Sequence, residues 1–347
     1  MCIFKSKNLL CFGLIAVIIS ALFLFISCSD SENDNFDAED ISEETTTEES
    51  AEEETEAETE PEIYEIVQYE RLIERDVTYK TVTDTNGEAN LRLDIYYPTN
   101  KIYHKNPTIV AFHGGSWVVG TRSDIIYAYN PLFDRLRANG YAVAAVQYRY
   151  VSDIIYFPAN LEDCIDAILY LAENTDEYDV DPDAIGVVGF SAGAHLAMLS
   201  AYAMKNFSSS EPLVNLNYCV SFAGPGKMYD DETSNYPRSI LYMLNALFNG
   251  SYEEKPELYK LGSPYYYLNG DIKTPLMLIH GGNDEVVPYS QSAMMYEKAA
   301  EMNIPCELVT IDNGTHMINL NFEMGSPSTT DLINLIEQFI YRNTDKE

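Results

Sequence analysis

Basic residues are scarce in this sequence. The chain of 347 residues carries 21 Lys and Arg against 55 Asp and Glu, which gives a formal net charge of −34. Nucleic-acid phosphates are bound by Lys and Arg, so this balance argues against nucleic acid as a partner and against strongly anionic polymers as substrates. Residues 63–347 keep the imbalance, with 19 basic and 38 acidic residues. Neutral substrates therefore fit the chain better than anionic ones.

Cysteine and histidine are also few. Cys164, Cys219 and Cys306 are the cysteines that follow Cys28, and the whole chain has five histidines. No cluster of these residues has the spacing of metal ligands, so the sequence requires neither a metal nor another cofactor. With so few histidines, the general base of a catalytic site can be sought by elimination.

The N-terminus has the pattern of an export signal. Lys5 and Lys7 precede an apolar run from Leu9 to Ile26, which predicts a signal peptide over residues 1–27. The run ends in a segment that resembles a bacterial lipoprotein cleavage site, with Cys28 as the lipidated first residue. The alternative is an uncleaved membrane anchor, because about 18 apolar residues nearly span a bilayer. Both interpretations predict an extracytoplasmic protein held at a membrane.

A different composition follows the cysteine. Residues 30–62 contain 17 Asp or Glu, no Lys or Arg, and few large apolar residues. Such a segment cannot bury enough surface to offset the entropy of ordering it, so residues 28–62 are expected to form a disordered tether. The remaining residues, 63–347, have the length of one domain.

The most specific motif in that domain is Gly189-Phe190-Ser191-Ala192-Gly193, directly after the apolar run 184–188. A strand that runs into G-x-S-x-G is the pattern of a nucleophile elbow, in which a tight strand-to-helix turn exposes the serine. Glycine is needed on both sides because side chains there would clash. The pattern therefore predicts Ser191 as a nucleophile.

A serine hydroxyl needs a base to take its proton and an acid to orient that base. His316 is the histidine left by elimination, because it lies in a loop after the strand-like run 306–311. The acid should follow the preceding strand, where Asp284 stands, and Asp312 is the competing candidate. Ser191, Asp284 and His316 also keep the chain order of the α/β-hydrolase arrangement.

An oxyanion hole completes the chemistry, because backbone N–H groups stabilise the charge that develops on a carbonyl oxygen. The strand-like run 108–112 leads into His113-Gly114-Gly115-Ser116-Trp117, an HGGG-type loop. Gly115, Ser116 and Ala192, the residue after the nucleophile, are the predicted donors. His113 is then expected to fix the loop by hydrogen bonds, and Trp117 is a candidate for lining the pocket.

These motifs together resemble the carboxylesterase group of α/β-hydrolases that includes hormone-sensitive-lipase-like esterases, bacterial acetyl-xylan and feruloyl esterases, and kynurenine formamidases. Further matching segments are Leu91-Arg92-Leu93-Asp94-Ile95-Tyr96-Tyr97-Pro98, Tyr148-Arg149-Tyr150, residues 157–163, Asp181-Pro182-Asp183, and residues 280–284 with Val287-Pro288. Ser116 and Ala194 stand where many relatives have glycine, which leaves the subfamily open.

The resemblance implies an α/β-hydrolase fold, with a mostly parallel central sheet flanked by helices. Apolar runs that alternate with helix-like segments predict the same class. Strands are expected near residues 108–113, 143–149, 185–190, 219–223, 275–280 and 306–311, and helices near 160–174, 192–204, 289–302 and 329–342.

The family's strand order places 275–280 between the strands of Cys219 and Cys306, beyond disulfide reach. All three cysteines of the domain are therefore expected to be free thiols. The tyrosine-rich connection 224–274 corresponds to a segment that forms part of a cap in related hydrolases. His195, one helical turn after the elbow, is expected to be structural.

The function that the resemblance implies is hydrolysis of carboxylic esters by a Ser-Asp-His triad through an acyl-enzyme. Small-molecule or polysaccharide esters, such as acetyl or feruloyl decorations, suit an extracytoplasmic tether. Three alternatives stay open: an exopeptidase of the prolyl-oligopeptidase type, an arylformamidase, and a non-catalytic binding protein on the same fold.

Overall fold

The computed structural model describes residues 72–84, 87–208, 214–229 and 236–344. The predicted signal peptide, Cys28 and the acidic tether all lie outside these ranges. Among the helices of the described ranges, none is both long enough and apolar enough for a bilayer crossing.

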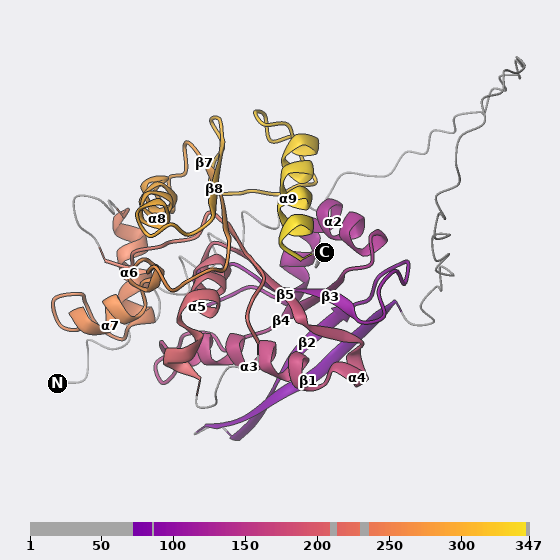
Figure 1. The fold of residues 1–347 in the computed structure, drawn as a ribbon. Coiled ribbons are helices and arrows are strands. Elements are labelled where there is room, and N and C mark those ends of the chain that lie inside the picture. Colours follow the sequence, from indigo (N-terminus) through magenta and orange to yellow (C-terminus); the bar gives the residue numbers. More distant parts are fainter. Residues whose placement is uncertain (1–71, 85–86, 209–213, 230–235, 345–347) are drawn as a thin grey trace, which may run out of the picture. The chain divides into compact units, whose positions relative to one another are not determined.

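An eight-stranded sheet with the strand order β1-β2-β4-β3-β5-β6-β7-β8 forms the centre of the described chain (Figure 1). Its strands are β1 (Ile73–Asp84), β2 (Gly87–Tyr96), β3 (Asn106–Phe112), β4 (Ala142–Val146), β5 (Val180–Phe190), β6 (Cys219–Phe222), β7 (Leu276–Gly281) and β8 (Cys306–Ile311). The hairpin of β1 and β2 is antiparallel, and β2 pairs antiparallel with β4. From β4 to β8 all pairs are parallel, so the sheet is mostly parallel as predicted.

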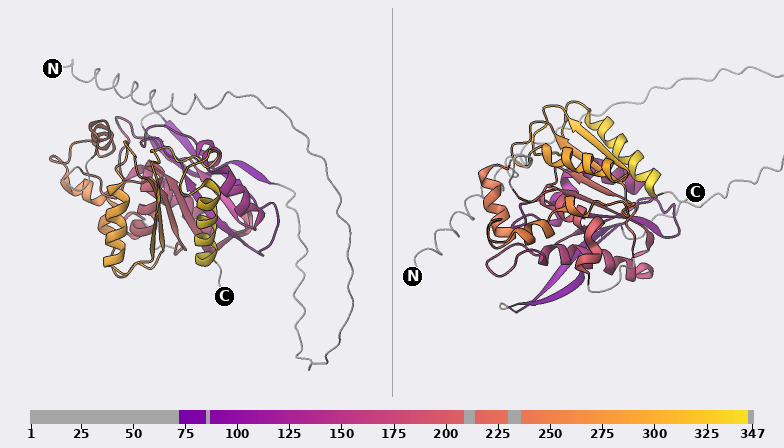
Figure 2. Two further views of the ribbon diagram at one scale, coloured as in Figure 1. Left: turned by 90° about the horizontal axis from the view of Figure 1, so that it is seen from above. Right: turned by 60° about the vertical axis from the view of Figure 1, so that its left-hand side comes forward.

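Helices connect the parallel strands and cover both faces of the sheet (Figures 1 and 2). They are α2 (Arg122–Ala138), α3 (Ala159–Glu173), α4 (Thr175–Tyr178), α5 (Ala192–Phe207), α6 (Arg238–Leu247), α7 (Pro256–Leu261), the 3₁₀ helix η1 (Pro264–Tyr267), α8 (Ser290–Glu301) and α9 (Thr329–Thr344). Arg135 of α2 bonds Asn334 of α9 at 2.8 Å, which ties these two helices together on one face. On the other face, α3 and α5 pack against each other.

The main hydrophobic core lies between the sheet and the α2–α9 pair. Alternate residues of the central strands face it, such as Val188 and Phe190 of β5 and Val220 and Phe222 of β6. This spacing follows from the period of two in a strand. The other face of these strands packs against α3 and α5, so residues 184–190 of β5 and all of β6 are buried.

The six predicted strands and four predicted helices correspond to β3–β8 and to α3, α5, α8 and α9. One boundary was wrong, because β4 ends at Val146 rather than near 149. After the strand, the side chains of Gln147, Tyr148 and Tyr150 bond the loop after β3, whereas Arg149 bonds Asp163 of α3. The hairpin of β1 and β2 and the helix α2 were not predicted.

The strand order confirms the prediction for cysteine. In the register, Cys219 of β6 pairs with Leu276 of β7, which pairs in turn with Cys306 of β8. A whole strand therefore separates the two sulfurs, and Cys164, Cys219 and Cys306 are free thiols.

The register also brings the functional loops together. Phe112 of β3 is level with Gly189 of β5, and Phe190 is level with Phe222 of β6. Gly281 of β7 is likewise level with Ile311 of β8. The loops that follow β3, β5, β7 and β8 therefore leave the sheet at the same carboxyl edge, where α/β sheets bind their ligands.

Candidate active site

The turn between β5 and α5 holds Ser191 in a strained backbone conformation, with φ of 53° and ψ of −117°. Glycine on each side makes this turn possible. A Cβ atom on Gly189 would lie 2.3 Å from the carbonyl oxygen of Gly193, and a Cβ on Gly193 would lie 2.2 Å from that of Phe112. The Ser191 N–H donates to the carbonyl of Phe222 at 2.8 Å, which anchors the turn to β6.

Two other loops bring an imidazole and a carboxylate to this hydroxyl. The Nε2 atom of His316 lies 3.0 Å from Ser191 Oγ, and its Nδ1 lies 2.7 Å from Asp284 Oδ2. A hydroxyl donates to Nε2 and the Nδ1–H donates to the carboxylate when the imidazole is neutral. The Asp284 side chain is fully buried, whereas Ser191 is 8% exposed. The three residues thus form one hydrogen-bonded chain that ends at an accessible hydroxyl.

The carboxylate of Asp284 is held from several sides. Its Oδ1 accepts hydrogen bonds from the N–H groups of Val286 at 2.8 Å and Val287 at 2.9 Å. Burial alone would raise the pKa of this carboxyl, but hydrogen bonds from His280 and His316 outweigh it and hold the pKa well below its ordinary value. Asp284 is therefore ionised at neutral pH and can stabilise a positive charge on His316.

The loops that bear Asp284 and His316 are joined through their backbones. The N–H of Asn283 donates to the carbonyl of Gly314 at 2.8 Å. A Cβ on Gly281 would lie 2.4 Å from that same carbonyl oxygen, so glycine permits the close approach. Asp312, the competing acid, has an exposed side chain and forms a β-bridge with Ser326. The structure thus brings Asp284, and not Asp312, to His316.

The loop after β3 has an unusual backbone at the residues predicted as oxyanion donors. Gly115, Ser116 and Trp117 have successive positive φ values of 118°, 51° and 65°. A Cβ on Gly115 would lie 2.0 Å from the carbonyl oxygen of Val119, so only glycine fits there. Ala192 begins α5, where the first N–H groups have no intrahelical acceptor. A Cβ on Gly193 would lie 2.2 Å from the carbonyl oxygen of Phe112 and 2.4 Å from that of His113, so the start of α5 packs closely against the beginning of this loop.

His113 fixes this loop, as the sequence predicted. Its Nδ1 donates to the carbonyl of Gly114 at 2.7 Å, and its Nε2 accepts from the Gln147 side chain at 3.1 Å. The Tyr148 hydroxyl donates to the His113 carbonyl at 2.7 Å, and the two rings stack with centroids 4.3 Å apart. Burial lowers the pKa of His113 to about 4, so the ring is neutral and keeps its one donor and one acceptor.

Trp117 and His195 form a second support. The Trp117 indole N–H donates to His195 Nδ1 at 3.2 Å, and His195 Nε2 donates to the carbonyl of Gly262 at 2.7 Å. Burial lowers the pKa of His195 to about 4, and the bond to Gly262 only partly opposes this. The structural interpretation of His195 is confirmed. Trp117 is 3% exposed, so its indole packs beneath the loop instead of lining an open pocket.

One residue of the site was not found by sequence reasoning. His280, the penultimate residue of β7, lies with Nε2 3.1 Å from Asp284 Oδ2. From the sequence, His280 was expected only at the end of the strand near 275–280 and at the start of the family-like segment 280–284, with no role in the site. Its position four residues before the acid, in the stretch from His280 to Asp284, is the signal that could have indicated the contact.

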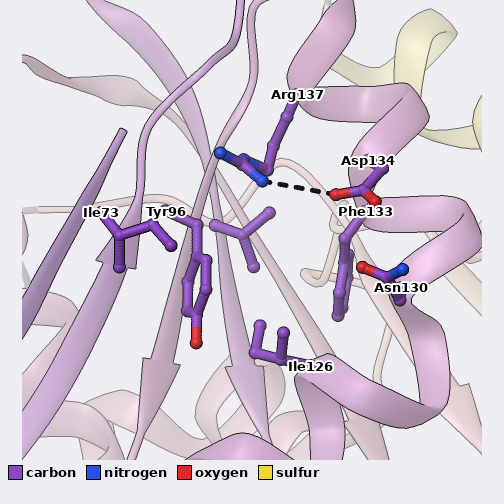
Figure 3. Close-up of a pocket in the computed structure, with 8 residues that line it drawn as sticks. Ile73, Tyr96, Ile126, Asn130, Phe133, Asp134 and Arg137 are labelled. Atoms are coloured by element: carbon purple, nitrogen blue, oxygen red, sulfur yellow. Dashed lines mark hydrogen bonds and ion pairs between the residues drawn. The ribbon is translucent and has the colours of Figure 1, made fainter. Parts of the chain in front are cut away.

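A separate cavity of about 190 Å³ lies between α2 and the edge formed by β1, β2 and β4 (Figure 3). Ile73, Tyr96, Phe133 and Arg137 are among its lining residues, and none of the predicted site residues lines it. Within the described ranges there is no group of three or more His, Cys, Asp or Glu arranged to hold a metal ion.

The sheet order and the serine on its β5–α5 turn define the class: the protein has an α/β-hydrolase fold. Residues 93–299, more than half of the chain, match the model of the BD-FAE family, and the chain belongs to that family.

Individual proteins agree with this assignment. The chain is 29% identical over 210 residues to esterase LipQ of Mycobacterium tuberculosis. The aligned region covers 59% of this chain and 48% of LipQ. It thus spans about half the length of the curated relatives it matches. A truncated carbohydrate esterase from gut microbiota has a TM-score of 0.64 at 21% identity, covering 80% of this chain and 99% of that one. The esterase Est2 of Thermogutta terrifontis has a TM-score of 0.63 at 23% identity, with coverages of 78% and 92%. These two structures support the fold.

Proposed function

We propose that this protein is a serine-dependent carboxylic ester hydrolase. The observation that carries the proposal is the hydrogen-bonded chain from Ser191 through His316 to Asp284 at the carboxyl edge of the sheet. Membership of the BD-FAE family and the similarity to named esterases support it.

In this proposal, Ser191 Oγ attacks the ester carbonyl while His316 Nε2 takes its proton. Asp284 orients the imidazole and stabilises its charged form. His316 then donates the proton to the departing alkoxide, which leaves an acyl group on Ser191. Water attacks this acyl-enzyme in a second cycle with the same base, and the acid product leaves.

The N–H groups of Gly115, Ser116 and Ala192 act as the oxyanion hole. They stabilise the negative charge that appears on the carbonyl oxygen as the tetrahedral intermediate forms. Two buried neutral histidines support this role, because His113 bonds the loop at Gly114 and His195 bonds it at Trp117. A loop that is already in place needs no reorganisation during the reaction.

For the substrate, we propose neutral esters, and among them acetyl or feruloyl groups on polysaccharides. The acidic charge of the chain disfavours anionic polymers, and one of the similar structures is described as a carbohydrate esterase. We also propose that Cys28 carries a lipid that holds the enzyme at an extracytoplasmic membrane face. Metabolic labelling with a fatty-acid analogue should mark the wild-type chain and not Cys28→Ala, and equal labelling would contradict the anchor.

The test of the activity compares wild type with Ser191→Ala on a short aryl ester. We expect the variant to lose at least about a thousandfold in kcat. Ser200→Ala is a matched control, because Ser200 lies on α5 with a buried hydroxyl that has no hydrogen-bond partner. Equal rates for wild type and Ser191→Ala would contradict the proposal. Acetylated xylan, feruloyl esters, long-chain glycerides, N-formylkynurenine and proline peptides then separate the substrate classes.

A further inference from the structure

The carboxylate of Asp284 has a second imidazole on it. Its Oδ2 lies 2.7 Å from His316 Nδ1 and also 3.1 Å from His280 Nε2. Both side chains of the His280–Asp284 pair are fully buried. Both imidazoles contact the same oxygen, Asp284 Oδ2. A change in the hydrogen bond that His280 donates therefore changes the negative charge on the oxygen that His316 contacts.

The protonation of His280 follows from its neighbours. Its Nε2 faces the Val287 carbonyl at 2.9 Å as well as the Asp284 carboxylate, and both of these accept hydrogen bonds. Nε2 therefore carries the proton. In the neutral ring Nδ1 is then an acceptor, and the Ser292 hydroxyl, 2.7 Å away on α8, donates to it. Ser292 is fully buried, so its hydroxyl is held to this partner.

We infer that Ser292 and His280 are positioning residues that extend the chain of Asp284, His316 and Ser191 to five members. Ser292 donates to Nδ1 of the tautomer that Val287 and Asp284 fix and holds the ring in place, so that His280 directs its Nε2–H at the oxygen that serves His316. This inference rests on the proposed function, since it assigns a task within the same site.

The consequence concerns the basicity of the catalytic imidazole. The titratable groups against the carboxylate are His280 of β7 and His316 of the loop after β8. Two further residues face His280: Ser292 of α8 and Tyr289, which directly precedes that helix. The ring centroids of Tyr289 and His280 are 5.8 Å apart, and the Tyr289 hydroxyl bonds Thr310. Without the His280 donor, negative charge concentrates on Oδ2 and stabilises protonated His316. A higher pH is then needed to free the base.

The experiment measures kcat, KM and the acidic limb of the kcat/KM profile for the full chain with a short aryl ester. We expect His280→Leu to lower kcat by about tenfold with little change in KM. We also expect its acidic limb to move to higher pH by about half a unit or more. His280→Gln, whose amide can donate, should restore part of both effects. Ser292→Ala should move the limb in the same direction by less, and Ser292→Thr should match wild type.

His104→Leu is the matched control, because His104 is an exposed histidine and is not among the residues of the site. Thermal melts identify any variant that fails to fold. If His280→Leu does not fold, the comparison of Ser292→Ala with Ser292→Thr decides the question. A proton NMR readout needs no substrate: the Nδ1–H resonance of His316 should move further downfield in Ser292→Ala.

The two proposals fail in different ways. If wild type and Ser191→Ala are equally inactive on every ester, the proposed function fails. The His316 Nδ1–H resonance in Ser292→Ala then still tests whether Ser292 and His280 act on Asp284. If wild type is active and Ser191→Ala is not, but folded His280 and Ser292 variants keep the wild-type kcat, acidic limb and resonance, the positioning role is overturned.

Discussion

Acidification should weaken the fold through His195. This ring is fully buried, and burial lowers its pKa to about 4, against an ordinary value of about 6.5. Between these values the unfolded chain binds more protons than the folded one. The contribution of His195 to stability is therefore complete above about pH 6.5 and is lost as the pH falls toward 4. For one such group, the free energy of unfolding falls by about 2 kcal/mol between pH 7 and pH 5.

Urea unfolding at pH 7 and pH 5 measures this loss. His195→Gln removes the titration, so its stability should fall by about 2 kcal/mol less than that of wild type over the same interval. Its stability at pH 7 should also be lower, because the bonds to Trp117 and Gly262 are disturbed. His104→Gln, at an exposed position, is the control and should follow wild type. Equal losses in wild type and His195→Gln would refute the reasoning.

Three further changes test the site geometry. Gly193→Ala adds a Cβ 2.2 Å from the Phe112 carbonyl oxygen, so it should lower the melting temperature and reduce kcat by at least about a hundredfold; wild-type kinetics would contradict this. Trp117→Phe leaves the buried acceptor His195 Nδ1 unpaired and should lower the free energy of unfolding, measured in urea, by about 1–3 kcal/mol. An unchanged free energy of unfolding would contradict this. Asp284→Asn should lower kcat by about 10⁴-fold while Asp312→Asn stays near wild type, and the reverse order would assign the acid to Asp312.

The central fold could be predicted because its elements have strong local patterns. The strands β3, β4, β6 and β7 and the second half of β5 are short buried runs, and α9 carries an apolar stripe at helical spacing. The hairpin of β1 and β2 has no such pattern, since most of the described residues of its outer half, 78–83 and 87–90, are exposed. Helix α2 contains Pro131 and a non-helical residue, Tyr129, so its sequence does not indicate one continuous helix.

The site divides in the same way. Ser191, Gly115 and Asp284 stand in motifs whose backbone requirements are visible in a few adjacent residues. The contact of His280 with Asp284 depends on how α8 and the β7–α8 loop pack, because Ser292 and Val287 fix the ring. The spacing of four residues indicates that His280 lies near Asp284, but the orientation of the ring arises from tertiary structure and is not visible in the sequence.

The identity of the nucleophile is tested most directly by covalent trapping. Wild-type protein is treated with a phosphonofluoridate ester, which reacts with activated serines, and the modified peptide is mapped by mass spectrometry. A single adduct on Ser191 is expected, with none in Ser191→Ala and much slower labelling in His316→Ala. An adduct on another residue, or ester hydrolysis that survives complete modification of Ser191, would contradict the assignment.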